Sequence, residues 1–201
     1  MRNPIRRSKK IGLTQGGRVK FGTPTEKWSR LFSKSTWERL SEESDGLRII
    51  RENPSKAYMH PASPAQIQEV LNRLPSDLTE SIKAVVLRRM PKYDEGNLID
   101  ARKRYSCIIL NASPHDLRTA WMSKPERSVL KHMAPWCIRW SENNGQWILQ
   151  WTENELRKYY LYHLLLHEVG HFNRWFSSSK RREDFAENFA LEWARKLGEL
   201  P

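Results

Sequence analysis

The clearest periodic pattern of apolar residues lies in the C-terminal third of the chain. From Glu153 onward no proline interrupts the sequence before the serine cluster at 177–179, and apolar residues recur three and four positions apart. The buried stripe of this predicted helix consists of Leu161, Leu164, Leu165 and Val169. A second helix is predicted over 181–197, which carries apolar residues at about one-turn spacing.

Further upstream the pattern changes from helical to extended. The runs at 82–89 and 105–111 are β-branched or apolar and are bounded by turn-forming sequence, so both are predicted strands. The polar stretch 91–104 between them is expected to be a loop or a hairpin connection. Residues 136–151 place aromatic and aliphatic residues on both sides of Asn-Asn-Gly at 143–145, which predicts a β-hairpin.

Two further helices are indicated by their start signals. Residues 65–71 follow a proline-containing linker and carry apolar residues three and four apart. Ser113 is a favourable N-cap and Pro114 suits the first helical position, so a helix is predicted through Met122, with a second one after Pro125. The resulting order of helix, strand, strand, helix, hairpin, helix, helix predicts an α+β domain with a small β-sheet.

Charge is distributed unevenly along the chain. Residues 1–60 contain 14 Lys and Arg against six Asp and Glu, within a formal net charge of +12 for the whole chain. We therefore expect a basic, partly flexible N-terminal arm at 1–61, with short amphipathic segments within 26–44, and a compact domain at 62–201. Three interpretations of the arm stay open: a solvated disordered segment, a surface that binds nucleic acid or another polyanion, and a small module of its own.

Composition narrows the class of protein. With 201 residues, of which 38% are hydrophobic and 29% charged, the chain is long enough for one domain with a sizeable core. No apolar run approaches the roughly 20 residues that a membrane-spanning helix needs, and no apolar segment of a secretory signal follows the basic N-terminus, so we expect a cytoplasmic protein. Cys107 and Cys137 lie in apolar, strand-like segments, which is typical of buried thiols rather than of a disulfide framework or a zinc ribbon.

Within the long predicted helix, residues 167–171 read HEVGH. His167 and His171 are four residues apart, so both imidazoles project from one side of the helix about 6 Å apart and can reach one Zn²⁺ at about 2.0–2.1 Å. Glu168 is the neighbour of the first histidine, where its carboxylate can take a proton from water at the metal. The alternative is a buried helix that carries histidines by coincidence. His163, one turn upstream, is interpreted as a core histidine rather than as a fourth ligand.

A catalytic zinc site also needs a third protein ligand. The candidates are Glu183 and Glu187, which lie one turn apart on the second predicted helix and can both face the first helix. Only one of them is expected to bind metal directly. Gly170, beside the second histidine, costs the helix roughly 1 kcal/mol relative to alanine. Its presence indicates close packing at this point, either around a metal site or against an adjoining strand.

The HEVGH sequence followed by EDFAENFA at 183–190 resembles the gluzincin clan of zinc metallopeptidases. The local pattern is most similar to lethal-factor-type domains and more loosely similar to ImmA/IrrE-like peptidases, and the resemblance covers residues 155–197. It implies a zincin-like α+β domain with a small mixed sheet, an HExxH active-site helix and a following Glu-bearing helix. By position it implies that Glu183 binds zinc and that Glu187 orients a histidine ligand. A tight helical hairpin would instead let Glu187 compete for the zinc.

The function implied by this resemblance is zinc-dependent hydrolysis of peptide bonds in a protein or peptide substrate. Zinc would be the cofactor, and Glu168 would be the general base that later delivers the proton to the departing amine. In zincins an edge strand near this point lies along the cleft. The hairpin at 136–151 is therefore the candidate strand for pairing with an extended substrate.

Two alternative functions stay open. A nucleic-acid-binding or polyanion-binding protein, in which the zinc helix pair is structural, would bind in a salt-dependent manner that survives loss of Glu168. A zincin-type toxin or effector would use the same chemistry on one host protein. Loss of growth on expression, relieved by Glu168→Gln, would distinguish the effector from a housekeeping peptidase.

Overall fold

The computed structural model describes residues 46–174 and 178–200. The described residues belong to one compact unit, Gly46–Pro201. The predicted amphipathic segments at 26–44 lie outside the described residues, as does most of the basic arm. The fold is accordingly that of this unit.

This unit begins earlier than the sequence predicts. The predicted start is residue 62, but strand β1 (Arg48–Arg51) pairs in parallel with strand β3 (Ala84–Arg88) and joins the main sheet. The β1 sequence, RIIR, carries only two apolar residues between two arginines and gives a weak strand signal. Pairing with a buried neighbour, rather than local pattern, makes this segment part of the domain.

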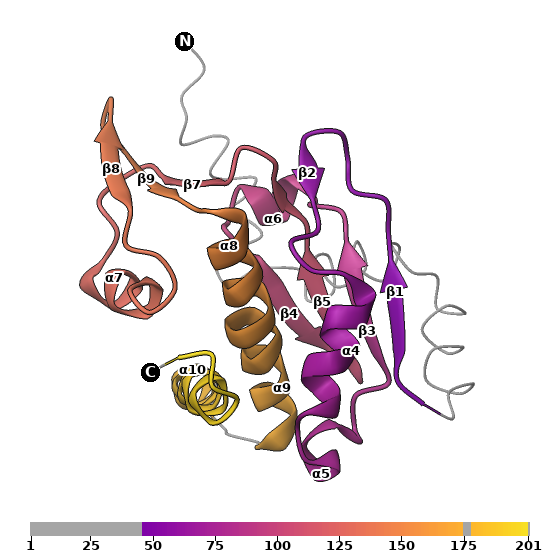
Figure 1. Cartoon of the computed structure of the whole chain (residues 1–201). Helices are drawn as coiled ribbons and strands as arrows, with labels where there is room; N and C mark the ends of the chain where they lie inside the picture. Colours follow the sequence, from indigo (N-terminus) through magenta and orange to yellow (C-terminus); the bar gives the residue numbers. More distant parts are fainter. Residues whose placement is uncertain (1–45, 175–177, 201) are drawn as a thin grey trace, which may run out of the picture. The chain divides into compact units, whose positions relative to one another are not determined.

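The unit is an α+β fold in which helices pack on a small mixed sheet (Figure 1). The sheet has the order β1-β3-β5-β4, with β5 spanning Cys107–Asn111 and β4 spanning Ala101–Arg104. Strands β1, β3 and β5 are parallel, and β4 is antiparallel to β5. The predicted α+β class is thus confirmed. The predicted strands at 82–89 and 105–111 correspond to β3 and β5, and the stretch 91–104 contains β4, which forms a hairpin with β5.

Strands β3 and β5 form the centre of the sheet because their sequences suit burial on both faces. They read AVVLR and CIILN, and every residue of both strands is buried. Continuous apolar runs of this kind are typical of parallel strands that are covered on both sides. Cys107, at the start of β5, is a buried free thiol, as is Cys137, which confirms the prediction for both.

The helices follow their capping signals. Ser63 forms a capping box with Gln66 and starts α4, and Thr152 forms one with Glu155 and starts α8. The helices are α4 (Pro64–Asn72), α5 (Ser76–Thr79), α6 (Lys92–Glu95), α7 (Arg127–Met133), α8 (Glu153–Tyr159), α9 (Leu165–Asn173) and α10 (Ser179–Lys196). Among the described residues, no helix is both long enough and apolar enough to cross a membrane.

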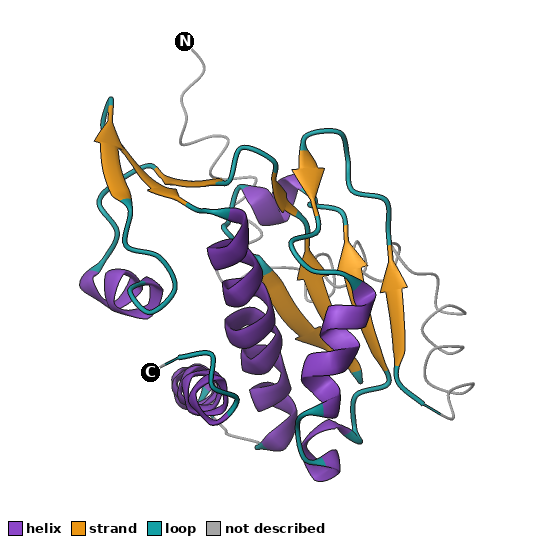
Figure 2. Ribbon diagram, viewed as in Figure 1, coloured by secondary structure: helices purple, strands orange, loops and turns teal. Residues whose placement is uncertain are grey.

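The long helix predicted from Glu153 is present, but it is not uniform. A π-helical turn, η1 (Tyr160–Leu164), joins α8 to α9, and the three segments form one rod in Figure 2. This rod and α4 lie over the main sheet, while α10 packs against α9 and η1 (Figure 1). The second predicted helix, 181–197, corresponds to α10.

A second, antiparallel sheet has the order β7-β9-β8, with β7 at Arg118–Trp121, β8 at Trp140–Asn143 and β9 at Gln146–Gln150. It contains the predicted hairpin. Asn144 and Gly145 both have positive φ, of 49° and 77°, as the two central residues of a type I′ hairpin turn require.

The helix predicted from Ser113 through Met122 is wrong. Ser113 and Pro114 form the short strand β6, which pairs with β2 (Tyr58–Met59), and β7 follows in place of the predicted helix. Proline fits an edge strand as well as a helix start because neither position needs its missing N–H. Leu117, between β6 and β7, has a φ of 58°, which lies outside the helical region and prevents a continuous helix.

Helices α9 and α10 approach each other closely at Gly170. A Cβ atom added to Gly170 would lie 3.0 Å from Ala186 Cα and 3.2 Å from both Cβ and Cδ1 of Phe189. The sequence predicted that Gly170 allows close packing either around a metal site or against a strand. The element that packs against it is helix α10. Any larger residue would push α10 away from α9.

We predict that Gly170→Ala lowers the free energy of unfolding of the metal-free protein by up to about 2 kcal/mol, because an overpacking cost of about 1–3 kcal/mol is only partly offset by the roughly 1 kcal/mol gained in helix propensity. The measurement is urea denaturation in the presence of a chelator. Gly96→Ala is the matched control, because its nearest neighbour is Lys92 O at 3.5 Å and its φ is −68°. Equal effects of the two substitutions would contradict the close contact as the cause.

Candidate metal centre

Three potential ligand atoms from α9 and α10 face one another. The Nε2 atoms of His167 and His171 lie 3.1 Å apart. Glu183, near the start of α10, places Oε2 3.3 Å from His167 Nε2 and 3.6 Å from His171 Nε2. The structure therefore brings together the three residues that the sequence indicates as zinc ligands.

The spacing of these atoms fits a tetrahedral metal ion. Three ligand atoms that each bind zinc at about 2.0–2.1 Å in a tetrahedron lie about 3.3–3.4 Å from one another. The observed separations of 3.1, 3.3 and 3.6 Å bracket that value. Two imidazole nitrogens and one carboxylate oxygen are also a donor set found in catalytic zinc sites. The residues present thus fit a zinc ion with one coordination position left for water.

Glu187 lies on the opposite side of His167 from Glu183. Its Oε2 atom is 3.6 Å from His167 Nδ1, whereas Glu183 approaches Nε2 of the same ring. The Glu187 side chain is also more enclosed, with 12% of its surface exposed against 60% for Glu183. This placement suits a residue that holds the imidazole in one orientation rather than one that shares the metal.

His163 belongs to the surroundings of Glu187 and not to the ligand triangle. It is buried, its ring stacks on Tyr159 with centroids 4.8 Å apart, and its Nε2 lies 3.6 Å from Glu187 Oε2. Burial lowers the pKa of His163 to about 4. His132, on α7, approaches the other oxygen of Glu187 at 3.9 Å. Sequence reasoning gave no indication of this contact, because α7 is remote in the chain.

The pKa values of the two histidines in the triangle are shifted in opposite directions. Burial, the largest effect, lowers the pKa of His171 to about 4, with a further decrease from the adjacent His167. Burial also lowers the pKa of His167, but contacts with Glu183 and Glu187 and the charge of Glu168 outweigh it and raise the pKa to about 9. Without a metal, a proton on His167 would therefore balance part of the surrounding negative charge at neutral pH.

Glu168 is positioned differently from the other two glutamates. Only 4% of its surface is exposed, and burial raises the pKa of its carboxyl to about 7. Its Oε2 atom has no hydrogen-bond partner among the described residues. Ligand atoms of Glu168, His167 and His171 all lie within 4.8 Å of one another. A carboxylate with a pKa near neutrality, directly beside the ligand triangle, can both accept and release a proton at physiological pH.

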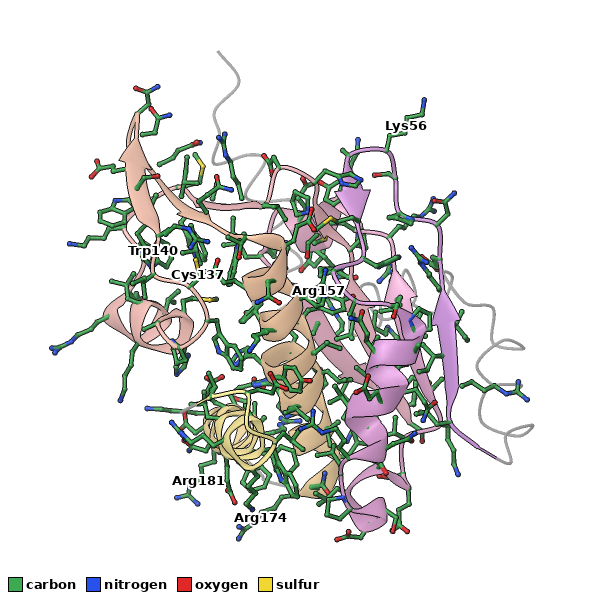
Figure 3. All side chains as sticks on the ribbon, in the orientation of Figure 1. Lys56, Cys137, Trp140, Arg157, Arg174 and Arg181 are labelled. Atoms are coloured by element: carbon green, nitrogen blue, oxygen red, sulfur yellow. The ribbon has the colours of Figure 1, made fainter. Side chains whose placement is uncertain are left out.

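The triangle opens into a cleft of about 550 Å³ between strand β4 and helices α9 and α10. The cleft is lined on the β4 side by Ala101, Arg102, Lys103 and Tyr105. Lys103 attaches this strand to the end of α9, because its Nζ atom donates to the His171 carbonyl at 2.8 Å and lies 4.1 Å from the centre of the Phe172 ring. Arg174, labelled beside α10 in Figure 3, also lines the cleft, together with Arg182. Basic side chains thus surround the opening.

The strand beside the site is β4 and not the predicted hairpin at 136–151. Strand β9 has β7 on one side and β8 on the other, so it has no free edge, and none of the residues 136–151 lines the cleft. Strand β4, by contrast, pairs only with β5 among the described strands. Sequence reasoning missed β4 because ARKR carries no apolar alternation. Its only signal was its position in the predicted hairpin connection.

Comparisons of the chain with family models, with curated proteins and with solved structures find no match.

We predict that the affinity of the protein for Zn²⁺ rises about tenfold per pH unit between pH 7 and 8.5. His167, with a pKa of about 9, holds a proton in this range that the metal must displace, whereas His171, with a pKa of about 4, holds none. Competition with a chromogenic chelator, corrected for protonation of the chelator, measures the slope. His115→Ala, at an exposed histidine away from the cluster, should leave it unchanged. An affinity independent of pH would contradict the proton on His167.

Proposed function

We propose that the protein is a zinc-dependent metallopeptidase with a zincin-like active site, in which His167, His171 and Glu183 bind the metal. The observation that carries this proposal is the triangle of ligand atoms at 3.1–3.6 Å, with the buried carboxylate of Glu168 immediately beside it. A structural zinc site is normally closed by four protein ligands, whereas this triangle opens into a cleft. The open position therefore favours catalysis over a purely structural role.

A zinc ion bound there would supply a Lewis acid that polarises a carbonyl group and lowers the pKa of a water molecule to about 7. Glu168, whose pKa burial raises to about 7, would be the base that takes a proton from the attacking water and the acid that returns it to the leaving amine. Glu187, on the Nδ1 side of His167, would hold that ring with Nε2 facing His171 and Glu183.

The substrate would bind as an extended peptide along the free edge of β4. The backbone of Lys103, within this strand, lies close enough to Glu168 to oppose the rise in its pKa, so a peptide along β4 would lie beside the residue that we propose as the general base. An added strand gains main-chain hydrogen bonds along β4 without requiring a particular sequence. The arrangement thus suits a peptide bond held in the cleft between β4 and the ligand triangle.

We predict that Glu168→Gln retains about one zinc per chain and loses hydrolytic activity by a factor of about 10²–10⁴, because the amide cannot act as a base. Zinc is measured by elemental analysis, and hydrolysis by mass spectrometry of a random peptide library incubated with the full-length protein. His167→Ala and Glu183→Ala should lose both zinc and activity.

Glu192→Gln provides the matched control, because this glutamate is 61% exposed on α10 and pairs only with Lys196 among the described contacts. It should keep both zinc and activity. Cleavage that persists in Glu168→Gln, or a parent protein that binds no zinc, would contradict the proposed function.

The role of Glu187 can be tested separately. Glu187→Ala should weaken zinc binding by about 10–100-fold without abolishing it, as is usual for a residue that orients a ligand. Chelator competition on Glu187→Ala and Glu183→Ala side by side distinguishes the two roles. If Glu187→Ala loses zinc while Glu183→Ala retains it, Glu187 is the metal ligand and Glu183 is the residue that orients a histidine.

A further inference from the structure

A second cavity, of about 450 Å³, lies away from the metal cleft. It is enclosed by β7, α7, α8 and the loops that precede β4 and β7, and it shares no lining residue with the cleft. Its walls are mainly apolar and include Leu117, Trp121, Met133 and Leu156. A cavity of this size and lining is typical of a site for a small organic group.

Most polar side chains in the wall have partners within the protein. Tyr58 donates its hydroxyl hydrogen to Glu95. Arg118 donates from Nε to Gln150 at 3.0 Å. Trp151 donates to Thr119 at 3.0 Å. The Tyr58 and Trp151 donors are satisfied, and Arg118 is exposed, so its remaining N–H groups can meet solvent; none of the three requires a ligand.

Asp100 is the exception. Among the residues that the structure describes, no hydrogen bond or ion pair reaches its carboxylate, although its side chain lines the cavity. Burial, with a smaller contribution from Asp94, raises the pKa of Asp100 to about 6, so the group is mostly ionised at neutral pH. Asp100 is half-buried, so its carboxylate faces the cavity rather than the protein interior, and a cation in the cavity would pair with it there.

The neighbouring Asp94 shows how this chain satisfies a buried carboxylate. Asp94 accepts hydrogen bonds from Arg102 at 2.7 Å and from Asn111 at 3.0 Å, and Arg88 lies 3.9 Å away. Asp100 is only six residues further along the chain and receives none of these contacts. Within the protein the Asp100 charge acts on the buried Tyr159 and Tyr160, whose pKa values it helps to raise, but it meets no cation there, which leaves the cavity as the place where a cation can approach it.

We propose that this cavity, the Asp100 pocket, binds an organic cation with an apolar body, such as an amidinium, guanidinium or primary ammonium group on an aromatic or aliphatic stem. The cationic group pairs with the Asp100 carboxylate, and the stem packs against the apolar wall. The rings of Trp121, Trp151 and Tyr159 also line the pocket, and aromatic faces attract cations. The site is independent of zinc and of peptide hydrolysis.

The test uses pairs of probes that differ only in charge. Benzamidine and neutral benzamide represent a free aromatic cation and its control, while N-acetyl-arginine methylamide and N-acetyl-citrulline methylamide represent a basic peptide side chain and its control. Isothermal titration of the full-length protein should show each cation binding at least about tenfold more tightly than its neutral partner. Whichever cation binds more tightly identifies the source of the ligand.

Asp100→Asn should remove the preference for the charged probe, whereas Asp77→Asn, at an exposed position on α5, should keep it. The thermal unfolding midpoint of Asp100→Asn should equal or exceed that of the parent, because an uncompensated charge disappears. Addition of benzamidine should raise the midpoint of the parent but not that of Asp100→Asn.

Three results would overturn the proposal. The first is equal or undetectable binding of charged and neutral probes by the parent. The second is a preference that persists in Asp100→Asn. The third is a lower unfolding midpoint for Asp100→Asn, which would mean that the carboxylate already has a structural partner.

Discussion

The close approach of α9 and α10 determines the geometry of the candidate metal centre. Gly170 lies three residues after His167 and one before His171, and the backbone that it contacts, at Ala186, lies between Glu183 and Glu187. The contact therefore fixes both carboxylates relative to both imidazoles. A separation larger by about 1 Å would move the Glu183 oxygen too far from the two imidazoles for bonds of about 2.0–2.1 Å to one shared ion. A glycine that weakens α9 as a helix is thus required by the packing of its neighbour.

The same packing concentrates negative charge around the histidines. Three glutamates lie around His167, and the ionisable groups respond differently. The pKa of His167 is raised, the pKa of His171 is lowered, and burial raises the pKa of Glu168 to about 7. Such opposed shifts cluster at functional sites because each group needs a different protonation state. A divalent cation would replace the proton on His167 and provide the charge that this arrangement lacks.

The local chemistry could be predicted from the sequence, whereas the arrangement of strands could not. Spacing along a helix is a local property, so HEVGH and the two glutamates one turn apart indicated which side chains would meet. The Asn144-Gly145 turn was equally clear, because its backbone conformation requires those residues. Strand β4 and the true edge of the sheet were missed, because the order of strands depends on contacts between segments distant in the chain. Ser113-Pro114 was misread since its two residues suit a helix start and an edge strand alike.

The π-helical turn between α8 and α9 has a consequence for how such sequences are compared. Each side of it is anchored separately: α8 by its capping box and by Tyr159 against Trp151, and α9 by Gly170 against α10. The turn accommodates one residue more than an α-helix would, and removal of that residue would rotate the following helix by about 100° relative to α8. The two histidines would then turn away from Glu183 although every letter of HEVGH was retained. An alignment that scores the motif alone would count such a chain as equivalent, so the length of the preceding helix is as informative as the motif.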